Sequence, residues 1–442
     1  MKNRIINILR LMGGAAAVVG AVVMTSCSKE STEIMELIPA DSRGFVILSD
    51  KFAQEAGIAP GNMSNTSSAI AANYEYALVQ SSASNEYKVL VPDDVKSFTK
   101  ALADSGYTNV TDGNFDVYSK PSADDIVVAR DGRGVWITNR QRPAEFVASE
   151  LEAAVKSPMS KVNWVAEYVK SNIKLFAGAV SERVIGAGED GSWYCFSGEQ
   201  KDKVLAVEFN ITGADGNPVE LKGLQTIDTD FLRYVPAGQG VFAAVGLTKD
   251  MDWDAAGKMA ASLGGTEVST YVDAIMPYLK SVDGTVAVAV MPDHPESLTA
   301  WKDPTMWNLL FMARMPQEKV NEAVNTLSLL AKMGGGTVTD AGQGVKVLNA
   351  GGVQVYAGNT DGNLAISTMP LTGKAQNELN SVFAGKNGAL EAYVPGTLVF
   401  DESDTGFNVK LVVQLEKSNG RIEMTLPGCD ETPLKKIISF LN

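Results

Sequence analysis

IPADSRGFVILSDKFAQEAG at residues 38–57 and VPAGQGVFAAVGLTKDMDWDAAG at residues 235–257 are the stretches that decide the predicted fold. Each contains a Pro-Ala turn, an apolar run of strand length, a polar residue suited to cap a helix, and a glycine that ends the helix. Further landmarks follow in the same order in both halves of the sequence, and such an ordered match indicates an internal repeat. The sequence therefore predicts two copies of one unit.

Turn signals between alternating apolar segments predict antiparallel strands. Asp-Gly at residues 361–362 and Asp-Gly-Asn at residues 215–217 are of this type. The second of these turns precedes PVELKG at residues 218–223, which we expect to be the returning strand of a hairpin. TVAVAV at residues 285–290 is apolar or small throughout, so it predicts a central strand buried on both faces.

Apolar residues at helical spacing predict helices that pack on these strands. Pro92 and Pro316 open two of the helices, where their missing N–H is not needed. Two further amphipathic helices are predicted near residues 143–175, and we interpret them as packing between the units rather than as a partner-binding groove. The buried positions of the predicted helices, including one at the C-terminus, are Val95, Phe98 and Leu102, then Val147, Leu151 and Val155, then Val162, Val165 and Val169, then Val320, Val324, Leu327 and Ala331, then Leu434, Ile437, Ile438 and Leu441.

The predicted fold class is α+β, with two duplicated units that are each a mostly antiparallel β-sheet with helices packed on one side. The first repeat covers residues 34–228 and contains the extra helices near 143–175. The second repeat covers residues 229–442 and ends in the C-terminal helix, which we expect to dock on the second sheet.

The segment at residues 1–26 has the features of a signal peptide. Basic residues precede the apolar run LMGGAAAVVGAVVM at residues 11–24, and two small residues follow it. A transmembrane anchor is the alternative, but at about 1.5 Å per residue this run reaches about 21 Å, short of the roughly 30 Å hydrocarbon core. We therefore expect export and cleavage.

Met24-Thr25-Ser26-Cys27 resembles a bacterial lipobox. The resemblance implies a diacylglycerol thioether and an N-linked acyl chain, such as palmitate, on Cys27, and more than one chain is needed for stable anchoring. The alternative is a cleaved signal that discards Cys27. Residues 27–33 would form the tether, and Ser28 implies outer-membrane sorting by resemblance to lipoprotein signals, facing either the periplasm or the cell surface.

Charge and cysteine content limit the partners and the chemistry. The formal charge is −14, and loss of Lys2, Arg4 and Arg10 with the signal peptide makes it −17. Such a surface disfavours nucleic acid and electrostatic docking on anionic lipid. Apart from Cys27, only Cys195 and Cys429 remain; two free thiols are favoured over a disulfide, which export would permit.

The order of the predicted elements behind a lipobox resembles a family of uncharacterised lipoproteins of Bacteroides-type bacteria, a domain of unknown function. The motifs that carry this resemblance are IPAD at residues 38–41 and the aromatic-led hairpin beginning near Trp193. It implies export and fold, and it provides no catalytic residues to transfer.

Motifs for chemistry are largely absent from the sequence. His294 is the single histidine, so mechanisms that need two are excluded, and no HExxH or GxSxG motif is present. Asp250, Asp252 and Asp254 imitate the start of a calcium loop, but Ala255 stands where that loop needs glycine. We therefore predict no catalytic residue, no cofactor and no metal, although the 52 acidic residues leave a carboxylate-dependent hydrolase as an alternative.

The long connection at residues 292–305 is the strongest candidate contact site in the sequence. It carries His294 and Trp301, and Trp307 follows it. A long loop with exposed aromatics suits binding of a glycan or protein, whereas a loop folded over the sheet edge with Trp301 as a plug is the structural alternative.

The leading hypothesis is a non-enzymatic scaffold or protein-binding module of the cell envelope, held at the membrane by its lipid anchor. Glycan binding through Trp301 and Trp307 and carboxylate-dependent hydrolysis, such as that of a glycoside hydrolase, are the alternatives.

Overall fold

The computed structural model describes residues 34–56, 75–82, 85–91, 95–112, 115–121, 125–130, 134–139, 149, 152–154, 156–181, 191–253, 278, 280–400 and 406–441. These residues belong to two units. The first unit contains the described residues between 34 and 219 together with 431–441, and the second unit contains those between 220 and 430. The predicted signal peptide, Cys27 and the tether lie outside the described residues.

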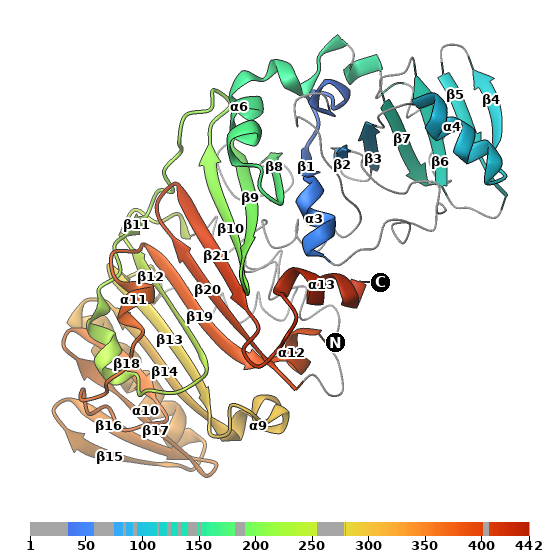
Figure 1. Cartoon of the computed structure of the whole chain (residues 1–442). Coiled ribbons are helices and arrows are strands. Elements are labelled where there is room, and N and C mark those ends of the chain that lie inside the picture. Colours follow the sequence, from blue (N-terminus) through green and yellow to red (C-terminus); the bar gives the residue numbers. More distant parts are fainter. Residues whose placement is uncertain are drawn as a thin grey trace. The chain divides into compact units, whose positions relative to one another are not determined.

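The predicted fold class, two duplicated α+β units with helices packed on one side of each sheet, is wrong. The described chain is mostly antiparallel sheet, and its helices are few (Figure 1). Helical spacing of apolar residues shows that a helix has one buried face, but it does not show how much of a sheet that helix covers. Most of the helices are short, so each covers only a local part of its sheet.

The strands of the first unit pair antiparallel in the order β10–β9–β8–β1–β2–β3–β7–β6–β5–β4. Their bounds are β1 Gly44–Leu48, β2 Glu75–Ser82, β3 Asn85–Val91, β4 Thr108–Asp112, β5 Phe115–Ser119, β6 Asp125–Arg130, β7 Gly134–Asn139, β8 Phe176–Ser181, β9 Trp193–Lys201 and β10 Val204–Thr212. The helices of this unit are η1 Ile34–Leu37, α3 Asp50–Glu55, α4 Val95–Asp104, η3 Met159–Lys161, α6 Asn163–Asn172 and α13 Pro433–Leu441.

The main core of the first unit lies between one face of this sheet and the helices η1, η3 and α6. Phe45 and Ile47 of β1 pack there with Val165 and Val169 of α6, and all four are nearly inaccessible to solvent. The second of the helices predicted near 143–175 is therefore a core element. Val147, Leu151 and Val155 of the first predicted helix lie outside the described residues.

The strands of the second unit pair antiparallel in the order β21–β20–β19–β12–β13–β14–β18–β17–β16–β15, and the short strand β11 pairs with the C-terminal end of β12. Their bounds are β11 Leu224–Gln225, β12 Val241–Leu247, β13 Gly284–Pro292, β14 Trp307–Arg314, β15 Thr337–Gly342, β16 Val345–Ala350, β17 Val353–Thr360, β18 Asn363–Ser367, β19 Gly388–Pro395, β20 Asn408–Leu415 and β21 Asn419–Thr425. The helices are η4 Thr229–Tyr234, α9 Leu298–Lys302, η5 Pro304–Met306, α10 Gln317–Met333, α11 Asn380–Phe383 and α12 Gly396–Phe400.

The long helix α10 confirms one prediction in detail. It begins directly after Pro316, ends at Gly334, and buries Val320, Val324 and Ala331. Its first turns pack on β14 and β18, and its later turns pack on β15, β16 and β17. Pattern and cap residues therefore located this helix correctly.

Two of the predicted strands differ from the structure. The returning strand at residues 218–223 does not form a hairpin, because only an isolated bridge joins Thr212 to Pro218; a proline cannot donate to a strand ladder. TVAVAV does form the central strand β13, but Val288 is 40% exposed, so this strand is not buried on both faces. The hairpin at Asp361-Gly362 is confirmed as β17 and β18.

The C-terminal helix α13 groups with the first unit and contacts β10, whereas we expected it on the second sheet. The backbone N–H of Leu434 donates to Oε1 of Gln200 at 3.1 Å. Leu434 and Ile438 are each 3% exposed, so the apolar side of this helix is covered.

Candidate functional site

The loop singled out in the sequence is held together by its own tryptophans. The indole Nε1–H of Trp301 donates to the carbonyl of Pro295 at 2.8 Å, and that of Trp307 donates to the carbonyl of Ala300 at 2.8 Å. Both tryptophan side chains are half-buried. Both indole N–H groups therefore donate to backbone carbonyls of the loop, which is the usual role of tryptophans that stabilise a fold.

His294 lies in the same loop and is exposed. Its Nδ1 atom is 3.5 Å from Oε1 of Glu296, and the two side chains are 65% and 71% exposed. A pair of this kind at the surface contributes little to stability.

The cysteines divide into one predicted anchor and two free thiols. Cys27 lies outside the described residues, whereas Cys195 is buried and Cys429 is half-buried. Burial raises the pKa of the Cys195 thiol to about 12, so this thiol is protonated at neutral pH. Among the described residues, no helix is long and apolar enough to cross a membrane.

The structure gives the acidic cluster after β12 no further support as a calcium site. Asp254 lies outside the described residues, and Lys249 beside the cluster pairs with Asp283 at 3.4 Å. Across the part of the chain that the structure describes, no three His, Cys, Asp or Glu side chains are grouped as metal ligands.

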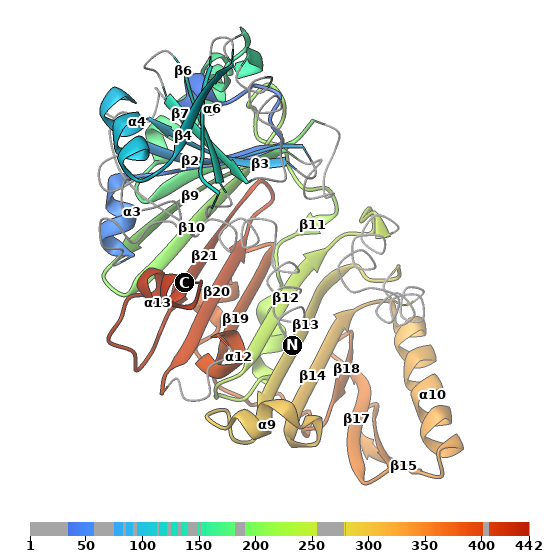
Figure 2. The same cartoon turned by 90° about the vertical axis from the view of Figure 1, so that its right-hand side faces the viewer.

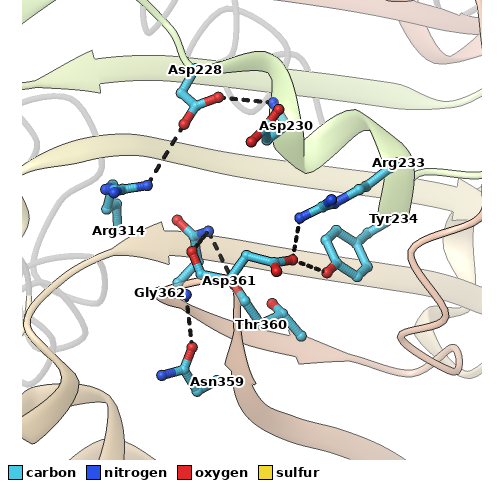
Figure 3. A network of polar contacts seen from close by, with 10 residues as sticks. Asp228, Asp230, Arg233, Tyr234, Arg314, Asn359, Thr360, Asp361 and Gly362 are labelled. Carbon is cyan, nitrogen blue, oxygen red and sulfur yellow. Dashed lines mark hydrogen bonds and ion pairs between the residues drawn. The ribbon is translucent and has the colours of Figure 1, made fainter. Parts of the chain in front are cut away.

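A polar network joins η4 to the tip of the β17–β18 hairpin (Figure 3). The guanidinium of Arg233 and the hydroxyl of Tyr234 both donate to Oδ2 of Asp361, which adopts a positive φ of 53° in the tight turn. Burial and this hydrogen bond raise the pKa of Tyr234. Arg233 and Asp361 are 42% and 52% exposed, so their ion pair adds little to the free energy of unfolding. Its effect is to hold the tip of the hairpin beside η4.

A pocket of about 580 Å³ lies where the chain leaves η4, next to Pro236, Ala237 and Gly238. Glu391 of β19 contributes to it and is paired with Lys410 of β20 at 3.1 Å, and the Glu391 side chain is only 16% exposed. Glu378 and Ser381 line it from the segment around α11. The volume suits a small ligand, but one of the two carboxylates is already engaged by a lysine. The sequence held no motif that linked these residues.

The second unit also has a broad apolar surface that we call the open face. It is formed by alternate residues of neighbouring strands, which face the same side because they are direct cross-strand partners. Val288 and Leu309 are 40% and 36% exposed, and the other members are half-buried. The open face consists of Val241, Ala243, Val288, Val290, Leu309, Leu390, Ala392, Leu411 and Val413.

Helices of the second unit cover the two ends of this sheet side. Val286 and Phe311 pack with the first turns of α10 at one end. Val394 and Met424 pack with Phe400 of α12 at the other end. Figure 2 shows β12, β13 and β14 in the space between α12 and α10. The largely apolar sequence of β13 is the available signal for this surface, but that pattern by itself predicts burial on both faces.

The comparisons with known proteins identify no family. No protein-family model and no curated protein matches the chain. One solved structure, a protein of unknown function from the DUF3598 family of Nostoc punctiforme, matches 91% of this chain and 100% of its own length, at 8% sequence identity and a TM-score of 0.13. A TM-score this low carries no argument on fold or function.

Proposed function

We propose that this chain is an exported lipoprotein, anchored through Cys27, that acts as a non-enzymatic protein-binding module of the cell envelope. The observation that carries the proposal is the open face of the second unit. It contains no charged or polar side chain, although it lies on a chain with a net charge of −14. Contiguous apolar surface of this kind is typical of an interaction site.

The energetic argument depends on the area left in water. Burial of apolar surface is worth about 25 cal/mol per Å², so a side chain such as Leu309, 36% exposed, leaves part of that stabilisation unused. Depletion of charge is also the compositional mark of the centre of a protein interface. A protein partner would remove this surface from water.

The two alternatives have less support. Glycan binding through Trp301 and Trp307 would use side chains whose indole donors already bond Pro295 and Ala300. In the pocket described above, hydrolysis by paired carboxylates would use Glu391, which Lys410 already engages. Both stay predictions from the sequence.

The test is cross-linking in intact cells followed by capture of the chain. We compare the wild type with the double variant Val288→Gln and Leu309→Gln, and with Lys332→Gln, an exposed control on α10 that receives the same residue. We expect a partner recovered in near-equal amount from wild type and control, and lost from the double variant. Recovery that is equal in all three would overturn the proposal.

The anchor has its own measurement. We expect Cys27→Ala to release the chain from the membrane fraction or to leave its precursor uncleaved. Continued fractionation of this variant as a mature membrane protein would contradict lipid anchoring.

A further inference from the structure

The first unit shows how a comparable apolar sheet side is covered. Its central strand β1 pairs with β2 and β8, as β12 pairs with β13 and β19 in the second unit. Val46 and Leu48 of β1 share a face with Phe176 of β8, because Leu48 is the direct partner of Phe176 and Val46 lies two residues away. All three are at most 2% exposed. This side of the first sheet is therefore closed.

Part of the cover of this closed side is the helix α13. Gln200 of β9 lies on the side of Phe176, because Phe176 pairs with Gly198 and Gln200 is two residues further along the strand. The side-chain oxygen of Gln200 accepts the N–H of Leu434. Leu434 and Ile438, spaced i and i+4, are buried in this seat. A short amphipathic helix thus packs beside β10 and covers part of this side of the sheet.

The second unit has no helix of this kind over its middle strands among the residues that the structure describes. Val286, at the α10 end, is level with Gly388 through Val245, and Val394, at the α12 end, lies six residues beyond Gly388. At about 3.3 Å per residue, the two covered parts are therefore about 20 Å apart along the strands. A helix with its side chains is about 10 Å in diameter. One helix lying across the strands therefore fits between the parts covered by α10 and α12.

We propose that the open face binds one amphipathic α-helix of a partner protein, with apolar residues at i and i+4 on its bound side. The inference rests on the proposed protein-binding function and names the partner's chemistry. The chain's net charge of −14 favours a helix with a basic outer side, and α13 itself carries Lys435 and Lys436 between its buried residues.

The probe is a fluorescent synthetic peptide with the sequence of residues 430–442, DETPLKKIISFLN. We measure its fluorescence anisotropy with the full chain, with the double variant Val288→Gln and Leu309→Gln, and with Lys332→Gln. We expect saturable binding to the wild type and the control, weakened about tenfold or more in the double variant because two apolar contacts are lost. A control peptide with Leu434→Gln and Ile438→Gln should not bind.

Three results would overturn the inference. The first is no saturable binding of the peptide. The second is binding that the double variant leaves unchanged, and the third is binding that Leu434→Gln in the protein increases, since the peptide would then occupy the vacated α13 seat. If the cross-linked partner depends on Val288 and Leu309 while the peptide fails, the proposed function stands and the helix inference is wrong. If neither depends on these residues, both are wrong.

Discussion

The central strands β1 and β12 have the same kind of neighbours on both sides, yet they differ in burial. Every residue of β1, Gly44–Leu48, is buried. In β12, Val241–Leu247, the alternate residues Val241, Ala243 and Val245 are only half-buried. Both strands are apolar at every position, so the strand sequence alone does not decide whether both faces are covered. The cover comes from other parts of the chain.

The covering residues of the first unit are large and come from separate elements. Phe52 of α3 packs edge-on against Phe176 with ring centroids 6.4 Å apart, and the ring centroid of Phe196 also lies 6.4 Å from that of Phe176. Gly198 has no side chain where the Phe176 ring passes; an added Cβ would lie 2.1 Å from that ring. The residues of the open face are alanine, valine and leucine, and none of them is an aromatic side chain that could cover its neighbours.

The largest effect should come from removing the centre of the closed side. We expect Phe176→Ala to lower the free energy of unfolding by about 3–5 kcal/mol, because a buried ring is replaced by a cavity. Leu309→Ala on the open face should lower it by less than about 2 kcal/mol, since this side chain is already 36% exposed. Urea denaturation followed separately in each unit measures both.

The second unit supplies a control for this comparison. Leu329 on the outer side of α10 is 59% exposed, so Leu329→Ala should change stability by no more than about 0.5 kcal/mol. If Leu309→Ala destabilised the second unit as much as Phe176→Ala destabilises the first, the open face would be a closed core and the comparison would fail.

Sequence patterns predicted the positions of individual helices and turns better than they predicted which sheet faces are covered by other segments. The proline and glycine signals bounded α10, and the Asp-Gly turn located the β17–β18 hairpin, because these depend on backbone chemistry within a few residues. The fold class and the burial of β13 were wrong because they depend on which distant segment packs where. For example, Leu434 of α13 and its hydrogen-bond partner Gln200 are 234 positions apart in the sequence.

The candidate site shows the same division. Trp301, Trp307 and His294 were found as a loop cluster, but the hydrogen bonds that use both indoles could not be predicted from composition. The pocket residues Glu391 and Lys410 come from two strands whose register is set by the whole sheet. Nothing in the local sequence brings them together.

The second prediction concerns the buried thiol of Cys195 in the first unit. The ordinary pKa of a cysteine thiol is 9.0, and burial raises the pKa of Cys195 to about 12 in the folded state. Below pH 9 the thiol is protonated in both states, so its contribution to stability is fully present. Between pH 9 and 12 only the unfolded thiol ionises, so stability falls as pH rises. At about 1.36 kcal/mol per pH unit, this loss is about 2 kcal/mol near pH 10.5.

Comparing the wild type with Cys195→Ala isolates this contribution from other alkaline effects. We expect the difference in unfolding free energy between the two proteins to narrow from pH 8.5 to 10.5. Thiol alkylation offers an independent measurement, since Cys429 of the second unit, half-buried, should react well before Cys195. Parallel pH curves for the two proteins would show that Cys195 is not held in a closed core.

The third prediction compares a matched pair of valines, one on each sheet side. Val46 of β1 is 2% exposed and Val288 of β13 is 40% exposed. Val→Thr nearly keeps the shape and replaces one methyl group with a hydroxyl, which must lose its hydrating water only where the site is closed. We expect Val46→Thr to lower stability by about 1–3 kcal/mol and Val288→Thr by less than about 0.5 kcal/mol.

Adding a saturating amount of the α13 peptide should raise the stability of the wild type, and Val288→Thr should gain less from it, because its hydroxyl would then be buried without a partner. Equal losses for the two valines in the absence of peptide would mean that the two sheet sides are equally dry, and the distinction between a closed and an open side would be wrong.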